Sequence, residues 1–444
     1  MRGLPNAPGK LQTPAIESVQ TELERAIGLF PADAAVQPNY TLALSSDDQS
    51  RRAANEFLKG LGLSVDDSAS RVDRTLDAKQ ELPDATARQK RQVSELVQYT
   101  QSLMSRSPLV REQFWKQADP KRGAESWNEQ IVDYRNYLWD RIVGRLPASD
   151  QPLNPRTRKI YEEQNWVGYE VVLDVYPEVI AWGHLLIPKG IEPGERRPVV
   201  VCQHGLEGQP ADVITRDQQQ QAFEYYKGFG AELADRGFVV FAPHNFYRGE
   251  NEFRQLQRKA HLLGWTLFGL TTVQHQRHLD WLSALPFVDP NRIGFYGLSY
   301  GGNTAVRVPA LLPQYAAVIS SGDFNDWIIK NATVDYIHSM VYHNVYEVFE
   351  WNLGHTFNHS DLAALIAPRP FMVERGHDDG VGIDEWVGSE YARVRRLYAR
   401  LGIAERTEIE FFNGPHTIHG QGTYAFLHRH LDWPPPGDFR GGAD

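Results

Sequence analysis

The stretch GFYGLSYGG, residues 294–302, places Ser299 between Gly297 and Gly301. The residues before the serine, RIGFYG, have the apolar texture of a buried β-strand, and GGNTAVRVPALL after it has the texture of a helix. Ser299 therefore stands in a strand-to-helix turn of the G-x-S-x-G type, which strains the serine backbone and exposes its hydroxyl above the carboxyl edge of a sheet. Gly297 and Gly301 have no side chains because, we expect, larger residues there would collide with the neighbouring helix and strand.

Seven short β-rich runs follow residue 160. Two of them, residues 168–177 and 179–188, lie close enough in the chain to pair as neighbouring strands. The other five are continuous apolar runs separated by helical stretches such as 222–237 and 272–286, and they cover residues 197–205, 237–244, 292–299, 315–322 and 369–376. Strands buried on both faces with helices between them predict a mostly parallel central sheet in an α/β domain.

The first 155 residues have a different texture. Residues 1–50 are rich in proline and predict an extended arm with one short helix near 15–30. Residues 88–106 predict a helix that must cover something, because one stripe is apolar: Val93, Leu96, Val97, Thr100, Leu103 and Met104. An aromatic helical pattern over 125–146 is broken by prolines, so we expect a helical accessory region over 1–155 and a catalytic domain over 156–444.

Composition excludes several classes of protein. The formal charge of −10 disfavours nucleic acid and anionic membranes as partners. No apolar run is long enough to span a membrane, and the first ten residues lack the apolar stretch of a signal peptide. We expect a soluble chain, either cytoplasmic or secreted with its signal removed. The single cysteine, Cys202, lies in an apolar run and is expected to pack as a small buried group.

A serine nucleophile needs a base, and the base needs an orienting acid, in the chain order serine, acid, histidine. The first acid candidates follow the run RPFMVERG, in HDDG. Asp379 is the favoured acid because it lies where the loop has left the strand and can turn back toward the site. Asp378 is the close competitor, and Glu374 is a more distant one.

The segment EIEFFNGPHTIHG offers two histidines as the base. A strand EIEFF is expected to end just before the turn NGPH, and His416, the first histidine after that turn, is favoured over His419. The tetrahedral intermediate also needs an oxyanion hole. One donor is the backbone N–H of Tyr300, directly after the nucleophile, and the other is expected from the HGLEG loop, with Leu206 as the best candidate. His204 is expected to organise that loop.

The segments VDPNRIGFYGLSYGG, QHGLEG, APRPFMVERGHDDG and FFNGPHTIHGQGTYAFLHRHL together resemble the α/β-hydrolase superfamily. More narrowly, they resemble its branch of acetyl xylan esterases, dienelactone hydrolases and prolyl-oligopeptidase-like enzymes, over roughly residues 165–435. This resemblance implies Ser299 as nucleophile, Asp379 as acid and His416 as base, with Tyr300 and the 205–206 loop at the oxyanion hole. The chain departs from the peptidases, which carry a β-propeller, and from dienelactone hydrolases, which use a cysteine and are shorter.

An aromatic insertion over about 323–365 is expected to lie over the carboxyl edge of the sheet as a lid or a wall of the acyl pocket. His355 and His359 within it have the spacing of a helical zinc pair but lack the glutamate of H-E-x-x-H. We therefore expect no metal and no cofactor.

These observations predict a serine carboxylesterase that acts through an acyl-enzyme on a small-molecule or oligosaccharide ester. Acetyl or aromatic acyl esters of plant polysaccharide fragments are the substrates that the resemblance favours. A serine peptidase or amidase of prolyl-oligopeptidase type and a non-catalytic binding protein on the same scaffold are the alternatives. Whether the chain forms a homo-oligomer stays open.

Overall fold

The computed structural model describes residues 15–28, 47–63, 84–249, 251–343 and 349–437. The chain divides into two compact units, residues 1–88 and 89–444. In the first unit, α1 (Ile16–Ile27) confirms the short helix expected near residues 15–30, and α2 (Asp47–Gly60) is a helix that the sequence did not predict. The boundary expected near residue 155 stays a prediction.

A nine-stranded sheet forms the centre of the second unit, in the order β1-β2-β3-β5-β4-β6-β7-β8-β9. The strands are β1 (Arg156–Glu162), β2 (Trp166–Tyr176), β3 (Val179–Pro188), β4 (Arg197–Gln203), β5 (Val239–Pro243), β6 (Val288–Leu298), β7 (Tyr315–Ser321), β8 (Phe371–Gly376) and β9 (Thr407–Phe412). The first three strands and the contact between β3 and β5 are antiparallel, and the remaining contacts are parallel. The predicted mostly parallel sheet is confirmed, and β1 is an additional edge strand whose exposed residues gave no apolar signal.

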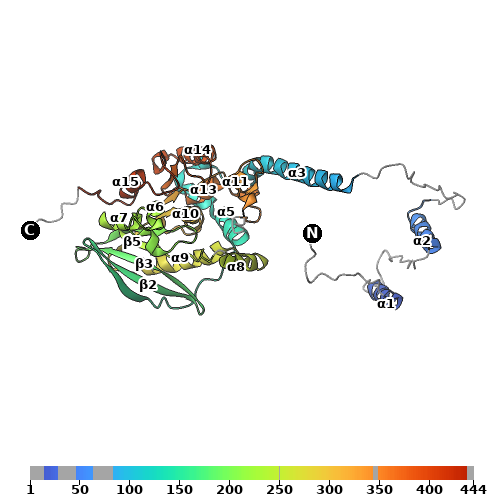
Figure 1. Ribbon diagram of the computed structural model, residues 1–444, viewed down its shortest axis with the longest axis horizontal. Coiled ribbons are helices and arrows are strands. Elements are labelled where there is room, and N and C mark those ends of the chain that lie inside the picture. Colours follow the sequence, from blue (N-terminus) through green and yellow to red (C-terminus); the bar gives the residue numbers. More distant parts are fainter. Residues whose placement is uncertain (1–14, 29–46, 64–83, 250, 344–348, 438–444) are drawn as a thin grey trace, which may run out of the picture. The chain divides into compact units, whose positions relative to one another are not determined.

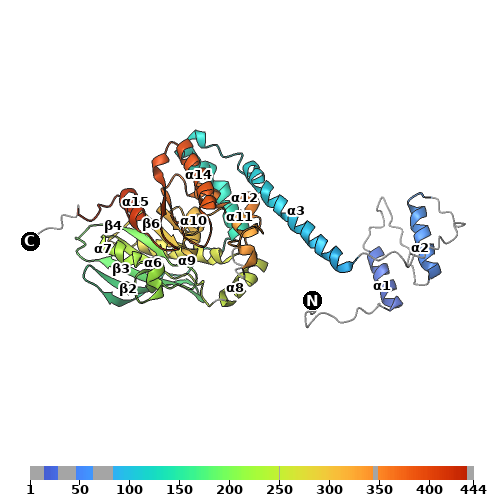
Figure 2. The same ribbon diagram turned by 45° about the horizontal axis from the view of Figure 1, so that its top comes forward.

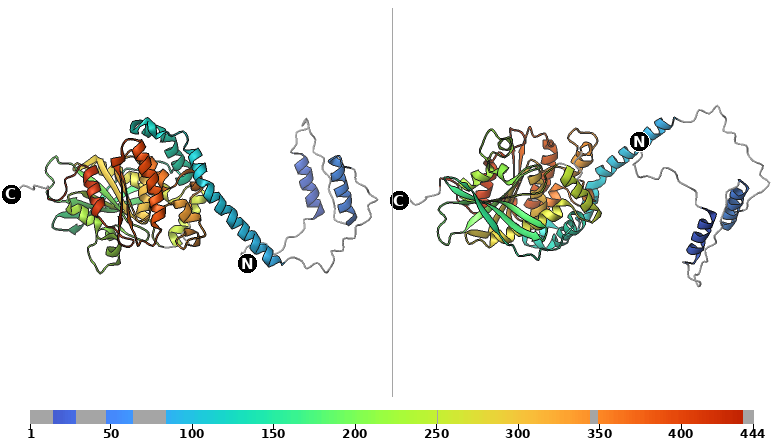
Figure 3. Two further views of the ribbon diagram at one scale, coloured as in Figure 1. Left: turned by 90° about the horizontal axis from the view of Figure 1, so that it is seen from above. Right: turned by 60° about the horizontal axis from the view of Figure 1, so that its bottom comes forward.

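Helices cover both faces of this sheet because its central strands are apolar on both sides. Along β4, Val199 and Val201 belong to one hydrophobic cluster, whereas Val200 and Cys202 belong to the other. The first cluster includes residues of α9 (Leu267–Ser283), α10 (Tyr300–Leu311), α13 (His359–Ile366) and α14 (Asp384–Arg400), and the second those of α6 (Gln221–Tyr226), α7 (Phe229–Asp235) and α15 (Gln421–His430). These layers can be followed in Figures 1 and 2 and from above and below in Figure 3. Cys202 is fully buried, as expected.

The remaining helices are short or lie before and within the sheet connections. They are α3 (Ala85–Phe114), η1 (Pro120–Arg122), α4 (Ala124–Gln130), α5 (Val132–Tyr137), the π-helical turn η2 (Leu138–Val143), η3 (Pro210–Val213), α8 (Asn251–Leu262), α11 (Trp327–Ala332), η4 (Met340–Tyr342), α12 (Leu353–Thr356) and η6 (Ala404–Arg406). None of the helices in these described segments has the length and apolarity that a membrane crossing requires.

One helix prediction needs correction. The apolar stripe of α3 was expected to be covered, but Val93 and Leu96 are 61% and 64% exposed. Farther along the helix, Gln101 Nε2 donates to the Ala332 carbonyl at 2.7 Å. The helical stretch expected over 222–237 is helical and consists of two helices, α6 and α7, because Lys227 and Gly228 between them both adopt left-handed backbone conformations.

The contact between β6 and α10 is as close as the sequence predicted. A Cβ atom on Gly297 would lie 2.3 Å from the carbonyl oxygen of Gly301, and a Cβ atom on Gly301 would lie 2.4 Å from the carbonyl oxygen of Gln203 on β4. Real Cβ atoms do not approach backbone oxygens this closely, so the two glycines allow three backbone segments to meet.

Gly297→Ala should therefore destabilise the protein by about 3 kcal/mol, because the added methyl must push α10 away from β6. The matched control is Gly388→Ala in α14, where an added Cβ meets nothing within 4 Å. That substitution should raise the free energy of unfolding by about 0.5–1 kcal/mol, because alanine restricts the unfolded chain. Equilibrium urea unfolding of both variants measures the difference, and similar stabilities would contradict the close approach.

Several histidines are buried in neutral form. His204 and His275 are fully buried, and this burial lowers the pKa of each to about 3. His275 Nδ1 lies 2.7 Å from the hydroxyl of Tyr315, and His204 Nε2 accepts the backbone N–H of Asn245 at 3.1 Å. Between these lowered pKa values and the ordinary histidine pKa of about 6.5, the imidazoles are therefore unprotonated in the folded protein and protonated in the unfolded chain.

We predict that the free energy of unfolding decreases as the pH is lowered from about 6.5 to about 4. In this range the unfolded state binds protons at His204 and His275 and the folded state does not, which costs about 1.4 kcal/mol per pH unit for each histidine. Burial also lowers the pKa values of His278 and His359, whereas Glu390, with a pKa raised by burial to about 7, acts in the opposite direction. Urea unfolding near neutral pH and near pH ~5 tests this sign, and an equal or higher midpoint in acid would contradict it.

Candidate active site

Ser299 lies between the end of β6 and the start of α10, at the carboxyl edge of the parallel strands. Its backbone φ is 62° and ψ is −125°, a conformation that non-glycine residues rarely adopt. The backbone N–H of Ser299 donates to the carbonyl of Ser321 at 2.9 Å, and its carbonyl accepts the N–H of Asn303 at 2.9 Å. These bonds to β7 and to α10 hold the strained turn in place and present the side chain at the sheet edge.

His416 and Asp379 are brought together by the loops after β9 and β8. His416 Nδ1 lies 2.8 Å from Asp379 Oδ2, although 37 residues separate them in the chain. The carboxylate of Asp379 also accepts the backbone N–H of Val381 at 2.9 Å and lies 3.2 Å from Nη1 of the buried Arg375. Burial by itself would raise the pKa of Asp379, but the hydrogen bond with His416 and the charge of Arg375 lower it below its usual value. The carboxylate is therefore ionised at neutral pH and can orient the imidazole.

The alternative acids occupy different surroundings. Asp378 is exposed, and its backbone N–H donates to the Gly414 carbonyl at 3.0 Å. Glu374 is fully buried, and burial raises its pKa. Its carboxyl group accepts hydrogen bonds from the hydroxyls of Tyr296 and Ser321 at 2.8 and 2.6 Å and from the Gly420 backbone N–H at 3.0 Å. Glu374 thus ties the loop that carries the two candidate histidines to the strands below it.

The second candidate base, His419, has a different partner. Its Nδ1 lies 2.7 Å from Glu410 Oε1, and its ring stacks on Phe412 with 4.5 Å between the ring centroids. His416 instead lies against Gly322 at the end of β7, where a Cβ atom would come within 2.8 Å of its ring. His416 and Ser299 line the same cavity, of about 710 Å³. Among the described residues no hydrogen bond joins the two side chains. Hydrogen bonds between a nucleophile and its base are often long in a free enzyme and shorten when substrate binds.

The loop after β4 lies beside the serine. A Cβ atom on Gly205 would be 3.0 Å from Ser299 Cβ, so glycine is needed for this approach. The Gly205 N–H donates to the hydroxyl of Tyr226 at 2.7 Å, whereas the N–H of Leu206 has no acceptor among the described residues. Leu206, Ser299 and Tyr300 line one cavity, and α10 begins at Tyr300, where helical N–H groups have no acceptor within their own helix. An oxyanion could be bound between these two backbones.

His204 organises the loop after β4, as the sequence predicted. Its Nε2 accepts the Asn245 N–H, so its Nδ1 carries the proton and donates to the Gly205 carbonyl at 2.8 Å. Because this imidazole stays neutral and has both nitrogens bonded, it fixes the direction of the backbone next to Leu206.

Sequence reasoning missed one residue of the site. Arg375 lies within the apolar strand β8 and is only 2% exposed. It forms ion pairs with Asp379 and Asp384 and donates to the Gly382 carbonyl at 2.8 Å, so it shapes the loop around the candidate acid. Two adjacent charged residues, Glu374 and Arg375, at the end of a buried apolar run were the signal that could have revealed it.

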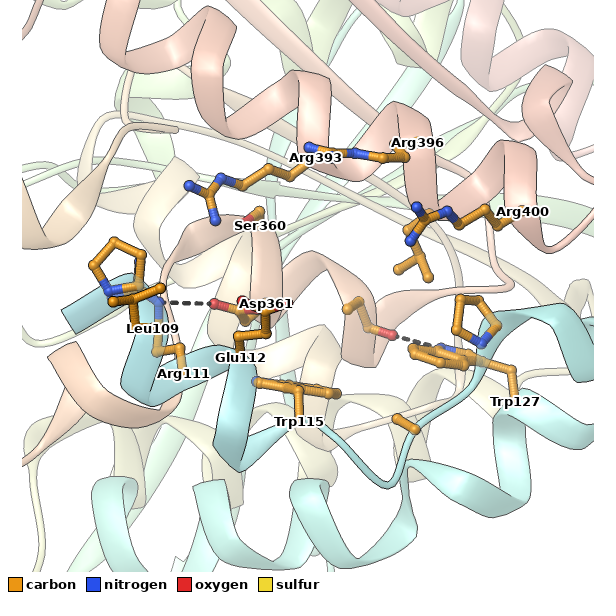
Figure 4. Close-up of a pocket in the computed structure, with 15 residues that line it drawn as sticks. Leu109, Arg111, Glu112, Trp115, Trp127, Ser360, Asp361, Arg393, Arg396 and Arg400 are labelled. Carbon is orange, nitrogen blue, oxygen red and sulfur yellow. Dashed lines mark hydrogen bonds and ion pairs between the residues drawn. The ribbon is translucent and has the colours of Figure 1, made fainter. Parts of the chain in front are cut away.

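A separate cavity of about 440 Å³ lies between α3, α4 and α14. Figure 4 shows Arg393, Arg396 and Arg400 of α14 along one side, opposite Trp115 and Trp127. Its lining includes none of Ser299, Asp379 and His416, so this cavity is distinct from the candidate active site.

Comparison with known proteins agrees with this architecture. Residues 199–342 match the Dienelactone hydrolase family. The protein named "Putative hydrolase YtaP" from Bacillus subtilis (strain 168) is 26% identical over 274 residues, which cover 60% of this chain and 87% of that protein.

Two solved structures have similar folds. A "putative acetyl xylan esterase" from Bacteroides fragilis matches with a TM-score of 0.53 at 18% identity, over 65% of this chain and 76% of that one. A CE15 glucuronoyl esterase from Teredinibacter turnerae also matches with a TM-score of 0.53, at 17% identity, over 69% of this chain and 85% of that one. The sheet order, the turn at Ser299 and these structural matches together show that the chain has the α/β-hydrolase fold.

Proposed function

We propose that this protein is a serine carboxylesterase. The observation that carries the proposal is the pairing of His416 with the buried, ionised Asp379 beside a cavity that also contains Ser299. Serine at neutral pH is a weak nucleophile, so a base oriented by a carboxylate is the feature that distinguishes a hydrolytic site from a structural turn. The match to a hydrolase family over residues 199–342 supports the same function.

In the proposed reaction, the Ser299 hydroxyl attacks the ester carbonyl while His416 accepts its proton. Asp379 keeps the imidazole in the correct tautomer and stabilises the imidazolium. The backbone N–H groups of Leu206 and Tyr300 bind the negatively charged oxygen of the tetrahedral intermediate, each worth about 3–4 kcal/mol. His416 then protonates the departing alcohol, and water activated by the same histidine releases the acyl group from Ser299.

The ester substrate is proposed to come from plant polysaccharide fragments. Structures with this fold include proteins named as an acetyl xylan esterase and a glucuronoyl esterase. The cavity beside Ser299 and His416 is lined by polar side chains of Glu207, Gln220 and Gln221, which suit a hydroxylated alcohol such as a sugar. The structures named as esterases and the polar lining of the cavity together favour an esterase over a peptidase or a non-catalytic binding protein.

Ser299→Ala should reduce the hydrolysis of 4-nitrophenyl acetate by a factor on the order of 10⁴ or more, because it removes the nucleophile. Purified wild-type and variant proteins compared under saturating substrate measure this directly. Equal rates would show that hydrolysis does not use this serine, and the proposed function would then be wrong.

Asp379→Asn should lower kcat by about 10³–10⁴-fold, because the amide stabilises the wrong tautomer of His416 and cannot stabilise its protonated form. Asp378→Asn is the matched control: it is the adjacent, exposed carboxylate and should leave kcat within about twofold of wild type. Steady-state kinetics of the two variants on one ester decide between the neighbouring acids. A large loss in Asp378→Asn with little change in Asp379→Asn would reverse the assignment.

A further inference from the structure

Leu206, the proposed second donor of the oxyanion hole, lies between two residues that bind the loop after β5. Two residues before it, His204 Nε2 accepts the Asn245 N–H. One residue after it, Glu207 has a backbone φ of 59°, a left-handed conformation that residues with a side chain rarely adopt. Such a conformation persists only where surrounding contacts hold it.

Three polar groups of Glu207 bind the segment 247–249 after β5. Its backbone N–H donates to the Tyr247 carbonyl at 2.8 Å, and its carbonyl accepts Arg248 Nη1 at 2.7 Å. Oε2 of its side chain accepts the Gly249 N–H at 2.9 Å. The loop after β4 is therefore bound to the loop after β5 through the main chain and through one carboxylate.

Tyr247 extends this connection to α10. Its side chain is fully buried, and its hydroxyl lies 3.1 Å from Thr304 Oγ1, which donates to the Tyr300 carbonyl at 2.8 Å. The rings of Tyr247 and Tyr300 also pack edge to face, with 4.1 Å between the ring centroids. One buried residue thus contacts both the loop that carries Leu206 and the first residue of α10.

The oxyanion hole needs its two N–H groups at a fixed separation, because both must lie within hydrogen-bond distance of one oxygen atom. The close approach of Gly301 to Gln203 fixes the end of β4 against α10. Leu206, however, lies three residues farther along the loop and needs further contacts to hold it. The bonds of Glu207 to the segment 247–249 supply such contacts at the adjacent residue.

We propose that Glu207 is a positioning residue: its carboxylate, bound to the Gly249 N–H, holds the Leu206 N–H where the oxyanion forms. This inference rests on the proposed esterase function and adds a residue outside its nucleophile, base, acid and oxyanion donors. Glu207 acts through Leu206. Because a donor to the oxyanion acts in the transition state, its displacement lowers kcat/KM without weakening ground-state binding of the ester.

Glu207→Gly removes the carboxylate, and glycine adopts the left-handed conformation without strain, so the variant should fold. We expect its kcat/KM for 4-nitrophenyl acetate to fall by about 10–100-fold, part of the effect of losing one oxyanion donor. Glu207→Gln is the matched control: it keeps an oxygen that can accept the Gly249 N–H and should stay within about twofold of wild type. Equal losses in both variants, or an unchanged Glu207→Gly, would overturn the inference.

Urea unfolding of each variant checks that the fold is retained. If Glu207→Gly does not fold, Glu207→Asn takes its place, because asparagine tolerates the left-handed conformation and its side chain is one methylene too short to keep the bond to the Gly249 N–H. The same loss of kcat/KM is expected of it, and wild-type activity in this variant would overturn the inference.

Two ketones separate positioning from a general loss of structure. With phenyl trifluoromethyl ketone, the Ser299 oxygen bonds to the carbonyl carbon, the hydroxyl proton passes to His416, and the carbonyl oxygen becomes the oxyanion. Phenyl methyl ketone has the same shape and binds without this addition. Glu207→Gly should weaken inhibition by the first ketone by the same factor as kcat/KM and change inhibition by the second by less than about twofold. Equal weakening for both ketones would contradict a positioning role.

Glu207 also lines the cavity that Ser299 and His416 share, so contact with the alcohol must be distinguished from positioning. Methyl, benzyl and 4-nitrophenyl acetate have one acyl group and three different alcohols. A displaced oxyanion donor affects every ester, so Glu207→Gly should lower kcat/KM for all three by factors that agree within about threefold. A loss confined to one alcohol would assign Glu207 to alcohol binding and reject the inference.

Failure of the inference and failure of the proposed function give different results. If the wild type and Ser299→Ala hydrolyse none of the three acetates above background, the esterase function is wrong and the inference fails with it. If the wild type hydrolyses them, Ser299→Ala does not, and Glu207→Gly keeps the wild-type kcat/KM, the esterase function stands and only the role of Glu207 is wrong.

Discussion

Three backbone segments meet around Ser299 at distances that only glycine allows, and the arrangement of the site depends on this contact. Gly297 on β6 faces Gly301 on α10, and Gly301 faces the end of β4 at Gln203. The turn between them forces Ser299 to a φ of 62°, and the hydrogen bond to Ser321 on β7 holds it there. These backbone contacts hold the strained turn in place, so the Ser299 side chain starts from a fixed position at the edge of the sheet.

Strand β8 and the loop after it each supply one buried acidic side chain, and the two have different partners. Glu374, within the strand, binds hydroxyls of β6 and β7 and a backbone N–H of the loop that carries His416. Asp379, after the strand, is held by Arg375 and the Val381 N–H and pairs with His416 itself. The first group places the loop and the second orients the ring, so the imidazole is constrained at two levels before substrate binds.

The surroundings of Ser299 are more polar than the aromatic insertion indicated. Trp327 and Met340 do line the cavity that Leu206, Ser299 and Tyr300 share, as the expected acyl pocket wall would. Lys330 lies one helical turn from Trp327, however, with its ammonium 5.2 Å from the centre of the indole ring, and it forms an ion pair with Asp323 in the same wall. The aromatic residues of this insertion therefore lie beside an ion pair that the aromatic sequence pattern did not predict.

The sequence by itself determined the strands of the central sheet from β2 to β9, the turn at Ser299 and the order of nucleophile, acid and base candidates. These features follow from local patterns: apolar runs, glycine positions and the residues directly after a strand. It did not determine β1, whose residues are exposed, or the break at Lys227, where a lysine adopts a left-handed conformation within a helical pattern.

Only the tertiary structure decided that Asp379 and His416 pair, rather than Asp378 and His419. Asp378 and Asp379 are adjacent and of the same residue type, so the sequence does not show which of them faces the histidine. Asp379 and its partner His416 are 37 residues apart in the chain. The same holds for Arg375 and for the pair of Asp323 and Lys330, because burial and charge compensation depend on how loops from different strands fold over one sheet edge. Local periodicity reports which face of an element is apolar, but it carries no information about which polar groups meet there.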